Sequence, residues 1–309
     1  MAITAGDWVV GTIFLLQSLF GTLGNFSLLS NYLFHHFSGY KLRSTDLIVK
    51  NLIVSNCLVL FSSAIRYTLE SFRWYYAHND LSCQLFHYVL RVGRGLSIST
   101  TCLLSIAQAI TISPRSSRWA QLKGKISKLV IPSLTLCWIV AMLANVIHLM
   151  FIRRTLSFKN ISHRKSFGYC SSVRHDKNLE SVFITLLSFP DAVCLALMLW
   201  ASGSMVFILH RHQQRVQHLH RNSDSSKPSP EARATKTILL LVSTFICFYS
   251  LSSICHVLVA LFQNPSVLLV KITAVFTAAF STVSPFLLIS RDTNLDFDWR
   301  HSRKCPNSK

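Results

Sequence analysis

Apolar residues along this chain gather in seven long runs, separated by short polar and basic stretches. A helical run of about 20 apolar residues crosses a hydrocarbon core of about 30 Å. Strands of a membrane barrel would be about half as long, and only helices satisfy the backbone of longer runs in lipid. The pattern therefore predicts an all-α polytopic membrane protein with helices spanning residues 8–34, 47–65, 83–112, 129–151, 179–209, 237–262 and 267–289.

No shift in composition marks a second domain beside these spans. We therefore predict a single seven-helix domain over residues 1–309, which ends in a cytoplasmic tail at 290–309. The basic segment 210–233, between the fifth and sixth spans, contains two prolines and is predicted to be a flexible loop.

The composition identifies lipid as the main solvent of the folded chain. The chain is 50% hydrophobic and only 14% charged, which leaves too little polar surface for soluble domains. A net charge of +19 would suit a nucleic-acid-binding protein, but the cations lie between the apolar runs, as they do in membrane proteins. We therefore predict the lipid bilayer as a partner and no nucleic acid.

The distribution of Lys and Arg predicts the orientation of the bundle. The segments after the first, third, fifth and seventh spans carry about twice as many of these residues as the segments after the second, fourth and sixth. Lys and Arg accumulate on the cytoplasmic side, so the N-terminus is predicted outside and the C-terminus inside. Arg66, just after the second span, counts among the outer cations.

Two cysteines and one asparagine stand out on the outer side. Cys83 lies at the outer entrance of the third span, and Cys170 lies in the long outer loop after the fourth. Both would face an oxidising compartment during synthesis, so we predict a disulfide between them, with two free thiols as the alternative. Asn160, in an Asn-Ile-Ser sequon on the same loop, is a predicted glycosylation site.

Charged residues inside the spans are costly and therefore mark candidate functional positions. His87, Arg91 and Arg94 follow the i, i+4, i+7 spacing that places them on one face of the third span. His256 and Lys271 lie nearer the outer ends of the sixth and seventh spans. This excess of cations predicts that the outer half of the bundle binds an anionic or hydrogen-bond-accepting ligand.

Asp191 is an acidic residue deep within the fifth span, in the outer half of the bundle. It lies about 18 Å below the outer end of the fifth span and Arg94 about 16 Å below that of the third, at about 1.5 Å per residue. The two could pair as a structural link, or they could form a switch that an anionic ligand opens at Arg94. Phe183, Phe189 and Leu258 are predicted to supply apolar contacts to the ligand.

The sequence contains no motif of an enzyme or a metal site. A phosphate-binding loop, an HExxH motif and a GxSxG elbow do not occur in it, so no enzymatic activity and no cofactor are predicted. Four histidines between residues 210 and 220 have metal-like spacing but no convergent carboxylate, and they are predicted to be solvated.

Eight short motifs extend from the first inner loop to the end of the seventh span. In chain order they are RSTDLIVK (43–50), RVGRGLSISTTC (91–102), AITISPRSSRW (109–119), FGYCSSVRHD (167–176), SFPD (188–191), WASGSM (200–205), ARATKTI (232–238) and STVSPF (281–286). Together they resemble the motifs of vomeronasal type 1 receptors, and they cover nearly the whole chain.

This resemblance implies a multi-pass G-protein-coupled receptor in the plasma membrane of chemosensory neurons. Such a receptor would bind a pheromone-like small molecule from outside and activate an inhibitory-class heterotrimeric G protein. The two longer inner loops carry the basic residues that we predict to contact acidic groups of the G protein. They are Arg115, Arg118, Lys123, Arg215 and Lys236.

The chain departs from the large rhodopsin-like class of receptors. It has Thr111-Ile-Ser113 where that class has Asp-Arg-Tyr, and Ser284-Pro285 where that class has Asn-Pro. The activation motifs of that class therefore do not transfer to this chain, although Asn25 matches one of its landmarks in the first span.

Two alternatives remain at this point. A bitter-taste-type receptor would share the seven helices, but the outer cysteine pair and the Gly93-Arg94-Gly95 block argue against it. A small-molecule transporter or channel would also need charges at membrane depth.

Overall fold

A computed structural model describes residues 5–37, 44–71, 80–113, 123–154, 164–167, 170–173, 177–219, 230–261 and 267–304. Its elements, in chain order, are α1 (Ala5–Phe37), α2 (Ser44–Ser71), α3 (Asp80–Ile112), α5 (Ile126–Phe151), β1 (Ile152–Arg154), β2 (Arg164–Phe167), β3 (Cys170–Val173), α6 (Lys177–Leu219), α7 (Pro230–Leu261) and α8 (Val267–Lys304).

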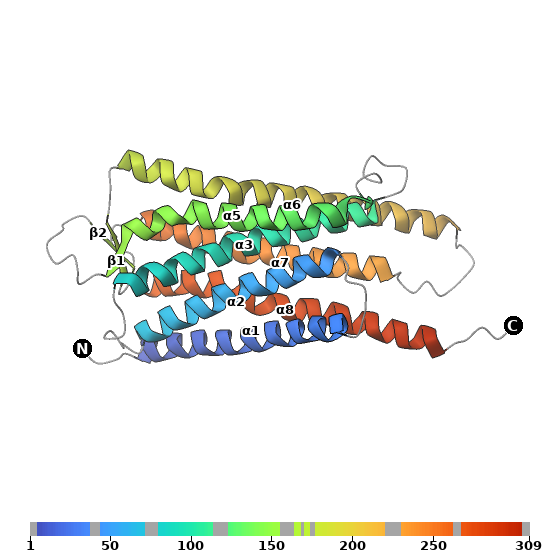
Figure 1. Ribbon diagram of the computed structural model, residues 1–309, viewed down its shortest axis with the longest axis horizontal. Helices are drawn as coiled ribbons and strands as arrows, with labels where there is room; N and C mark the ends of the chain where they lie inside the picture. The colour runs from blue at the N-terminus through green and yellow to red at the C-terminus, as the bar shows by residue number, and fades with distance from the viewer. Residues whose placement is uncertain are drawn as a thin grey trace.

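Seven helices in the described part are long and apolar enough to cross a membrane, and each overlaps one predicted span. They provide the segments Trp8–Phe34, Ser44–Arg66, Gln84–Ile112, Ile126–Val146, Phe189–Arg211, Ile238–Cys255 and Leu268–Ser290. The predicted all-α seven-helix bundle is therefore confirmed. Its helices run side by side along the long axis of the molecule, with α1 at one side and α6 at the other (Figure 1).

The structure adds one small sheet to the helices. Strands β1, β2 and β3 form an antiparallel three-stranded sheet in the order β1-β3-β2, within the segment between α5 and α6. It lies at the end of the bundle where α1 begins, whereas α8 ends at the opposite end (Figure 1). We name the end with the sheet the outer end and the opposite end the inner end, as the charge rule predicts.

The predicted flexible loop at 210–233 is partly wrong. Helix α6 continues to Leu219 and α7 begins at Pro230, so residues 210–219 and 230–233 of the predicted loop are helical. Residues 210–219 contain neither Gly nor Pro, so nothing local ends the helix where it leaves the apolar run. His210 bonds Gln214 on this exposed helix surface, with 3.0 Å between their Nε2 atoms.

Helix α3 is the central element of the bundle. It packs against α2, α5, α6 and α7, while α8 packs against α1, α2 and α7. The close approach of α2 depends on Gly93, because a Cβ there would lie 3.1 Å from the backbone nitrogen of Val59. In an 18-residue stretch of each span, 67% of the residues of α3 are buried, against 17% of those of α6. Side chains on α3 can therefore reach most of the other helices.

Candidate functional site

A narrow cavity lies between α2, α3, α7 and α8 in the middle of the bundle. Its empty space is about 350 Å³, counting any part open to solvent. The part of it that admits a water-sized sphere is only about 20 Å³, which is room for about one water molecule. The cavity must therefore widen before it can hold a ligand, since small-molecule pockets have about 300–1,000 Å³. The lining residues are Val59, Arg94, Ser97, Phe245, Phe248, Tyr249, Ser252, Phe276, Thr277, Phe280 and Ser281.

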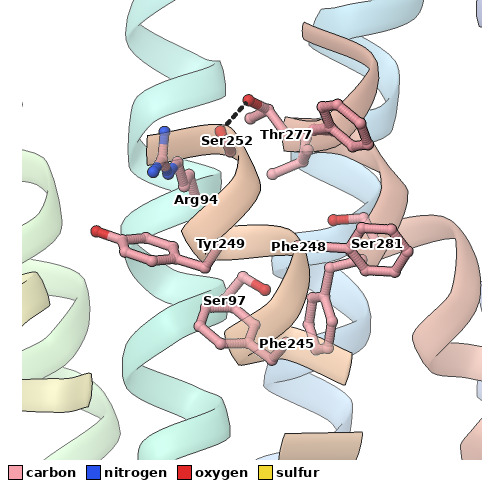
Figure 2. A pocket seen from close by; sticks show the side chains of 11 residues that line it. Arg94, Ser97, Phe245, Phe248, Tyr249, Ser252, Thr277 and Ser281 are labelled. Carbon is pink, nitrogen blue, oxygen red and sulfur yellow. Dashed lines mark hydrogen bonds between the residues drawn. The ribbon is translucent and has the colours of Figure 1, made fainter. Parts of the chain in front are cut away.

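The outer part of this cavity is polar. Arg94 extends from α3 at the same level as the hydrogen bond that joins Ser252 of α7 to Thr277 of α8, 2.9 Å between the hydroxyl oxygens (Figure 2). Arg94 supplies a guanidinium group, which can bind two oxygens of a planar anion at once. A ligand with an acceptor group would therefore place that group in the outer part.

The deeper part of the cavity is aromatic. Phe245 lies below Tyr249 in the view of Figure 2, and its ring packs edge-on against Phe280 with 4.6 Å between centroids. Phe245 also stacks on Tyr249 at 5.7 Å. Such rings offer large apolar contact areas. An apolar ligand body would fit here only after these rings move apart, because the present space is too small for one.

Tyr249 is the residue that links the two deep charges. Its hydroxyl donates a hydrogen bond to Asp191 Oδ2 on α6 at 2.9 Å. The guanidinium carbon of Arg94 lies over the Tyr249 ring, 4.8 Å from its centroid. The shared partner agrees with the equal depth predicted for Arg94 and Asp191. Sequence reasoning missed Tyr249, since tyrosine is common in apolar spans and its neighbours come from other helices.

A buried polar network forms the inner floor of the cavity. Asn56 of α2 donates to Ser284 Oγ of α8 at 2.9 Å and to Asn25 Oδ1 of α1 at 3.4 Å. Ser97 of α3 donates to Asn56 Oδ1 at 3.4 Å, and Asn25 also donates to the carbonyl of Ser281 at 3.1 Å. Ser97 and Ser281 line the cavity as well. These two residues therefore belong both to the cavity wall and to the hydrogen bonds that join α1, α2, α3 and α8.

The face predicted for His87, Arg91 and Arg94 does not converge on one site. His87 Nδ1 lies 2.8 Å from an Nη atom of Arg66 on α2, and Arg91 Nε donates to Asn145 Oδ1 on α5 at 2.9 Å. Of the three, only Arg94 lines the cavity. Seven residues extend over about 10 Å of helix, so long side chains on one face reach different neighbours.

Two residues of this outer region were missed or misplaced by sequence reasoning. Arg66, counted as an outer-loop cation, is only 6% exposed inside the bundle. Asn145, the partner of Arg91, is also buried. A polar residue in an apolar run was the available signal for Asn145. Nothing local distinguishes Arg66 from a cation at a span end.

The other residues predicted near the ligand have different positions. Lys271 is buried on α8, 6% exposed, and is not part of the cavity lining. His256 lies in α7 and Phe183 in α6, but their side chains are outside the described part. Phe189 and Leu258 are 67% and 37% exposed and do not line this cavity, and their predicted contact with a ligand stays a prediction. Periodicity alone could not distinguish lipid-facing from cavity-facing aromatic residues.

The inner and outer candidate residues are described only in part. Lys123 is exposed, and its Nζ donates to the carbonyl of Ser113, just beyond α3, at 2.9 Å. Arg215 lies in α6 and Lys236 in α7, with side chains outside the described part. The remaining inner residues, Arg115 and Arg118, lie outside the described residues, as does the outer Asn160.

The two outer cysteines lie in elements near each other. Cys83 is in the first turns of α3, and Cys170 begins β3, where it pairs with Arg154 of β1. Strand β1 packs against α3. The side chains of both cysteines are outside the described part, so their bond stays a prediction.

Comparison with known proteins gives a consistent result. The model of the vomeronasal organ pheromone receptor family matches residues 8–297. Human vomeronasal type-1 receptor 4 is 49% identical over 94% of this chain and 97% of its own length. Human vomeronasal type-1 receptor 2 is 47% identical over 90% of this chain and 70% of its length. Rat vomeronasal type-1 receptor 90 is 34% identical over 92% of this chain and 91% of its length.

Proposed function

The chain belongs to the vomeronasal organ pheromone receptor family, and from this premise we propose that it binds a small molecule from outside and activates an inhibitory-class G protein. It is a multi-pass plasma-membrane protein of a G-protein-coupled receptor family and not of an enzyme family. This membership sets aside the bitter-taste-type and transporter alternatives.

The ligand site in this proposal is the cavity, and Arg94 is its anchor. The supporting observation is that a cation at membrane depth lines the cavity beside four Ser and Thr residues and an aromatic cluster. The ligand would be small, with an apolar body between the phenylalanine rings and an anionic or acceptor group at Arg94. Lys271, with His87, Arg91 and His256, would supply positive potential around the path from outside to the cavity.

A ligand screen on cells tests this site. Arg94→Gln should weaken the response to an anionic agonist by roughly 10- to 100-fold, the value of a hydrogen bond to a charged group. Arg91→Gln removes the same charge at a position that bonds Asn145 and does not line the cavity, so it should weaken the response much less than Arg94→Gln. Equal losses in both variants, at equal surface expression, would contradict Arg94 as the anchor.

The inner surface with Arg115, Arg118, Lys123, Arg215 and Lys236 is proposed to receive the G protein. Its net positive charge suits the acidic groups of such a partner. Reversing all five charges should reduce nucleotide exchange on added G protein at least tenfold. Reversing Arg153 and Arg164, in the sheet at the opposite end, is the control. Undiminished exchange after reversal of all five charges would overturn this assignment.

At the outer end we propose the Cys83–Cys170 disulfide and a glycan on Asn160. The packing of β1 on α3 and the pairing of β1 with β3 support the first. Non-reducing peptide mapping of membrane-inserted protein should recover one cross-linked peptide containing both cysteines. Alkylation of both thiols in unreduced protein would disprove the bond. Glycosidase treatment should lower the mass of the parent protein, and it should not change the mass of the Asn160→Gln variant.

A further inference from the structure

Tyr249 joins three helices through two different parts of its side chain. The ring face contacts the guanidinium group of Arg94 on α3, and the hydroxyl holds the carboxylate of Asp191 on α6. The hydroxyl points away from the other labelled cavity residues, while the ring lies next to Arg94 (Figure 2). One side chain on α7 therefore lines the cavity with its ring and bonds α6 with its hydroxyl.

The contact with α6 matters because α6 is the least buried of the seven spans. In an 18-residue stretch of each span, 17% of the residues of α6 are buried, compared with 67% for α3 and 28% for α7. Helix α6 packs mainly on α3 and only slightly on α7, so a specific bond between α7 and α6 has more weight. A hydrogen bond to a carboxylate shifts an equilibrium by roughly tenfold or more.

We propose that Tyr249 is a latch that holds α6 against α7 in the ligand-free receptor and opens when an acceptor group binds Arg94. This inference rests on the proposed receptor function. An acceptor at Arg94 replaces the ring as the partner of the guanidinium group. The Tyr249 ring then shifts, its hydroxyl leaves Asp191, and α6 separates from α7.

The latch also assigns roles to two classes of ligand. A ligand shifts a conformational equilibrium only through its different affinity for the two states. A molecule with an acceptor group gains a bond to Arg94 in the open state and acts as an agonist. An apolar molecule of the same size fills the space between the phenylalanine rings without displacing Arg94, so it competes with the agonist but does not activate.

The test compares Tyr249→Phe, Asp191→Asn and the double variant. Tyr249→Phe removes the hydroxyl, so it breaks the bond to α6, and it keeps the ring that contacts Arg94. Asp191→Asn retains an acceptor and weakens the same bond. Tyr88→Phe is the matched control, because the Tyr88 hydroxyl donates to the carbonyl of Met142 at 3.3 Å, away from the cavity.

Two measurements on the ligand-free receptor report whether the latch is open. The first is basal nucleotide exchange on added G protein by purified receptor. The second is the rate at which N-ethylmaleimide labels Cys194, resolved by peptide mass spectrometry. Cys194 is half-buried on α6, three residues after Asp191, and packs on the main core cluster. The exposed Cys247 of α7 serves as the internal reference.

We expect Tyr249→Phe to raise both rates roughly five- to tenfold, and Asp191→Asn to raise them less. The double variant should match Tyr249→Phe, because both changes act on one bond. The Tyr88→Phe control should stay within twofold of the parent for both rates. A merely structural loss would instead lower exchange together with the amount of folded receptor.

The outcomes separate this inference from the receptor function. Faster Cys194 labelling in receptors that never activate a G protein would retain the latch and overturn the proposed function. Unchanged labelling and exchange in all three variants of an active receptor would overturn the latch and leave the function intact. Additive increases in the double variant would also overturn it, because Tyr249 and Asp191 would then act separately.

Discussion

The inner and outer halves of this bundle are packed in different ways. The inner half contains one continuous cluster of buried apolar side chains, contributed by α1, α2, α3, α5, α6, α7 and α8. The outer half contains small separate clusters, such as Phe14 with Ala274, and Val92 with Leu96 and Ala141. The outer half also contains buried cations, which include Arg66 and Lys271.

This difference in packing gives the outer and inner halves different functional properties. Close-packed interiors resist change, since cavities and overpacking both cost free energy. Charged and hydrogen-bonded contacts can exchange partners, because a ligand can offer the same chemistry. The outer half is therefore suited to recognition, and the inner half transmits a change only as movement of whole helices.

The largest expected effect comes from a cavity in the inner core. Leu104 of α3 is completely buried in the main cluster, so Leu104→Ala should lower the free energy of unfolding by about 2–3 kcal/mol. Thermal unfolding in detergent measures this loss. Leu143→Ala on α5, at a lipid-facing position, should change stability by less than about 0.5 kcal/mol. Equal losses would mean that the inner half is not the more tightly packed one.

A smaller effect is expected at the floor between the halves. Asn56→Ala removes the bonds to Asn25, Ser284 and Ser97 and leaves buried polar groups unsatisfied. The expected loss is about 2 kcal/mol, again by thermal unfolding. Ser204→Ala on exposed α6, where the hydroxyl bonds its own helix, is the control. A stable Asn56→Ala variant would show that the network does not hold the four helices together.

A substitution at the contact between α2 and α3 tests how closely these two helices pack in the outer half. A methyl group on Gly93 would lie 3.0 Å from Leu58 Cβ and 3.1 Å from the Val59 backbone nitrogen. Gly93→Ala should therefore cost about 1–2 kcal/mol, because backbone must shift. Gly203→Ala on α6 meets no atom within 4 Å and should be neutral or slightly stabilising. Similar melting temperatures for both variants would contradict this close approach.

The smallest expected effect on stability lies in the cavity itself. Thr277→Val removes the partner of the Ser252 hydroxyl and should cost about 0.5–1 kcal/mol. Its effect on the potency of an acceptor-bearing agonist should be larger than its effect on melting. Thr244→Val, where the hydroxyl bonds the Leu240 carbonyl on the exposed side of α7, is the control. Equal potency in both variants would remove this pair from the ligand site.

The sequence by itself determined the number of spans, their approximate limits and the family. Hydropathy over about 20 residues is a local property, because lipid imposes the same requirement on every spanning segment. Family motifs are also read in order along the chain. The end of α6 was predicted less well, because a helix continues in water when no residue interrupts it.

Only the tertiary structure decided which of the buried charges share a site. Spacing along α3 placed His87, Arg91 and Arg94 together, but packing gave them partners on α2, α5 and α7. Packing also joined Arg94 to Asp191 through Tyr249. Tyr249 belongs to α7, and nothing in the sequence around Arg94 or Asp191 indicates that this helix supplies their shared partner. The rotation and height of each helix depend on the packing of residues far apart in the chain, so no local pattern contains this information.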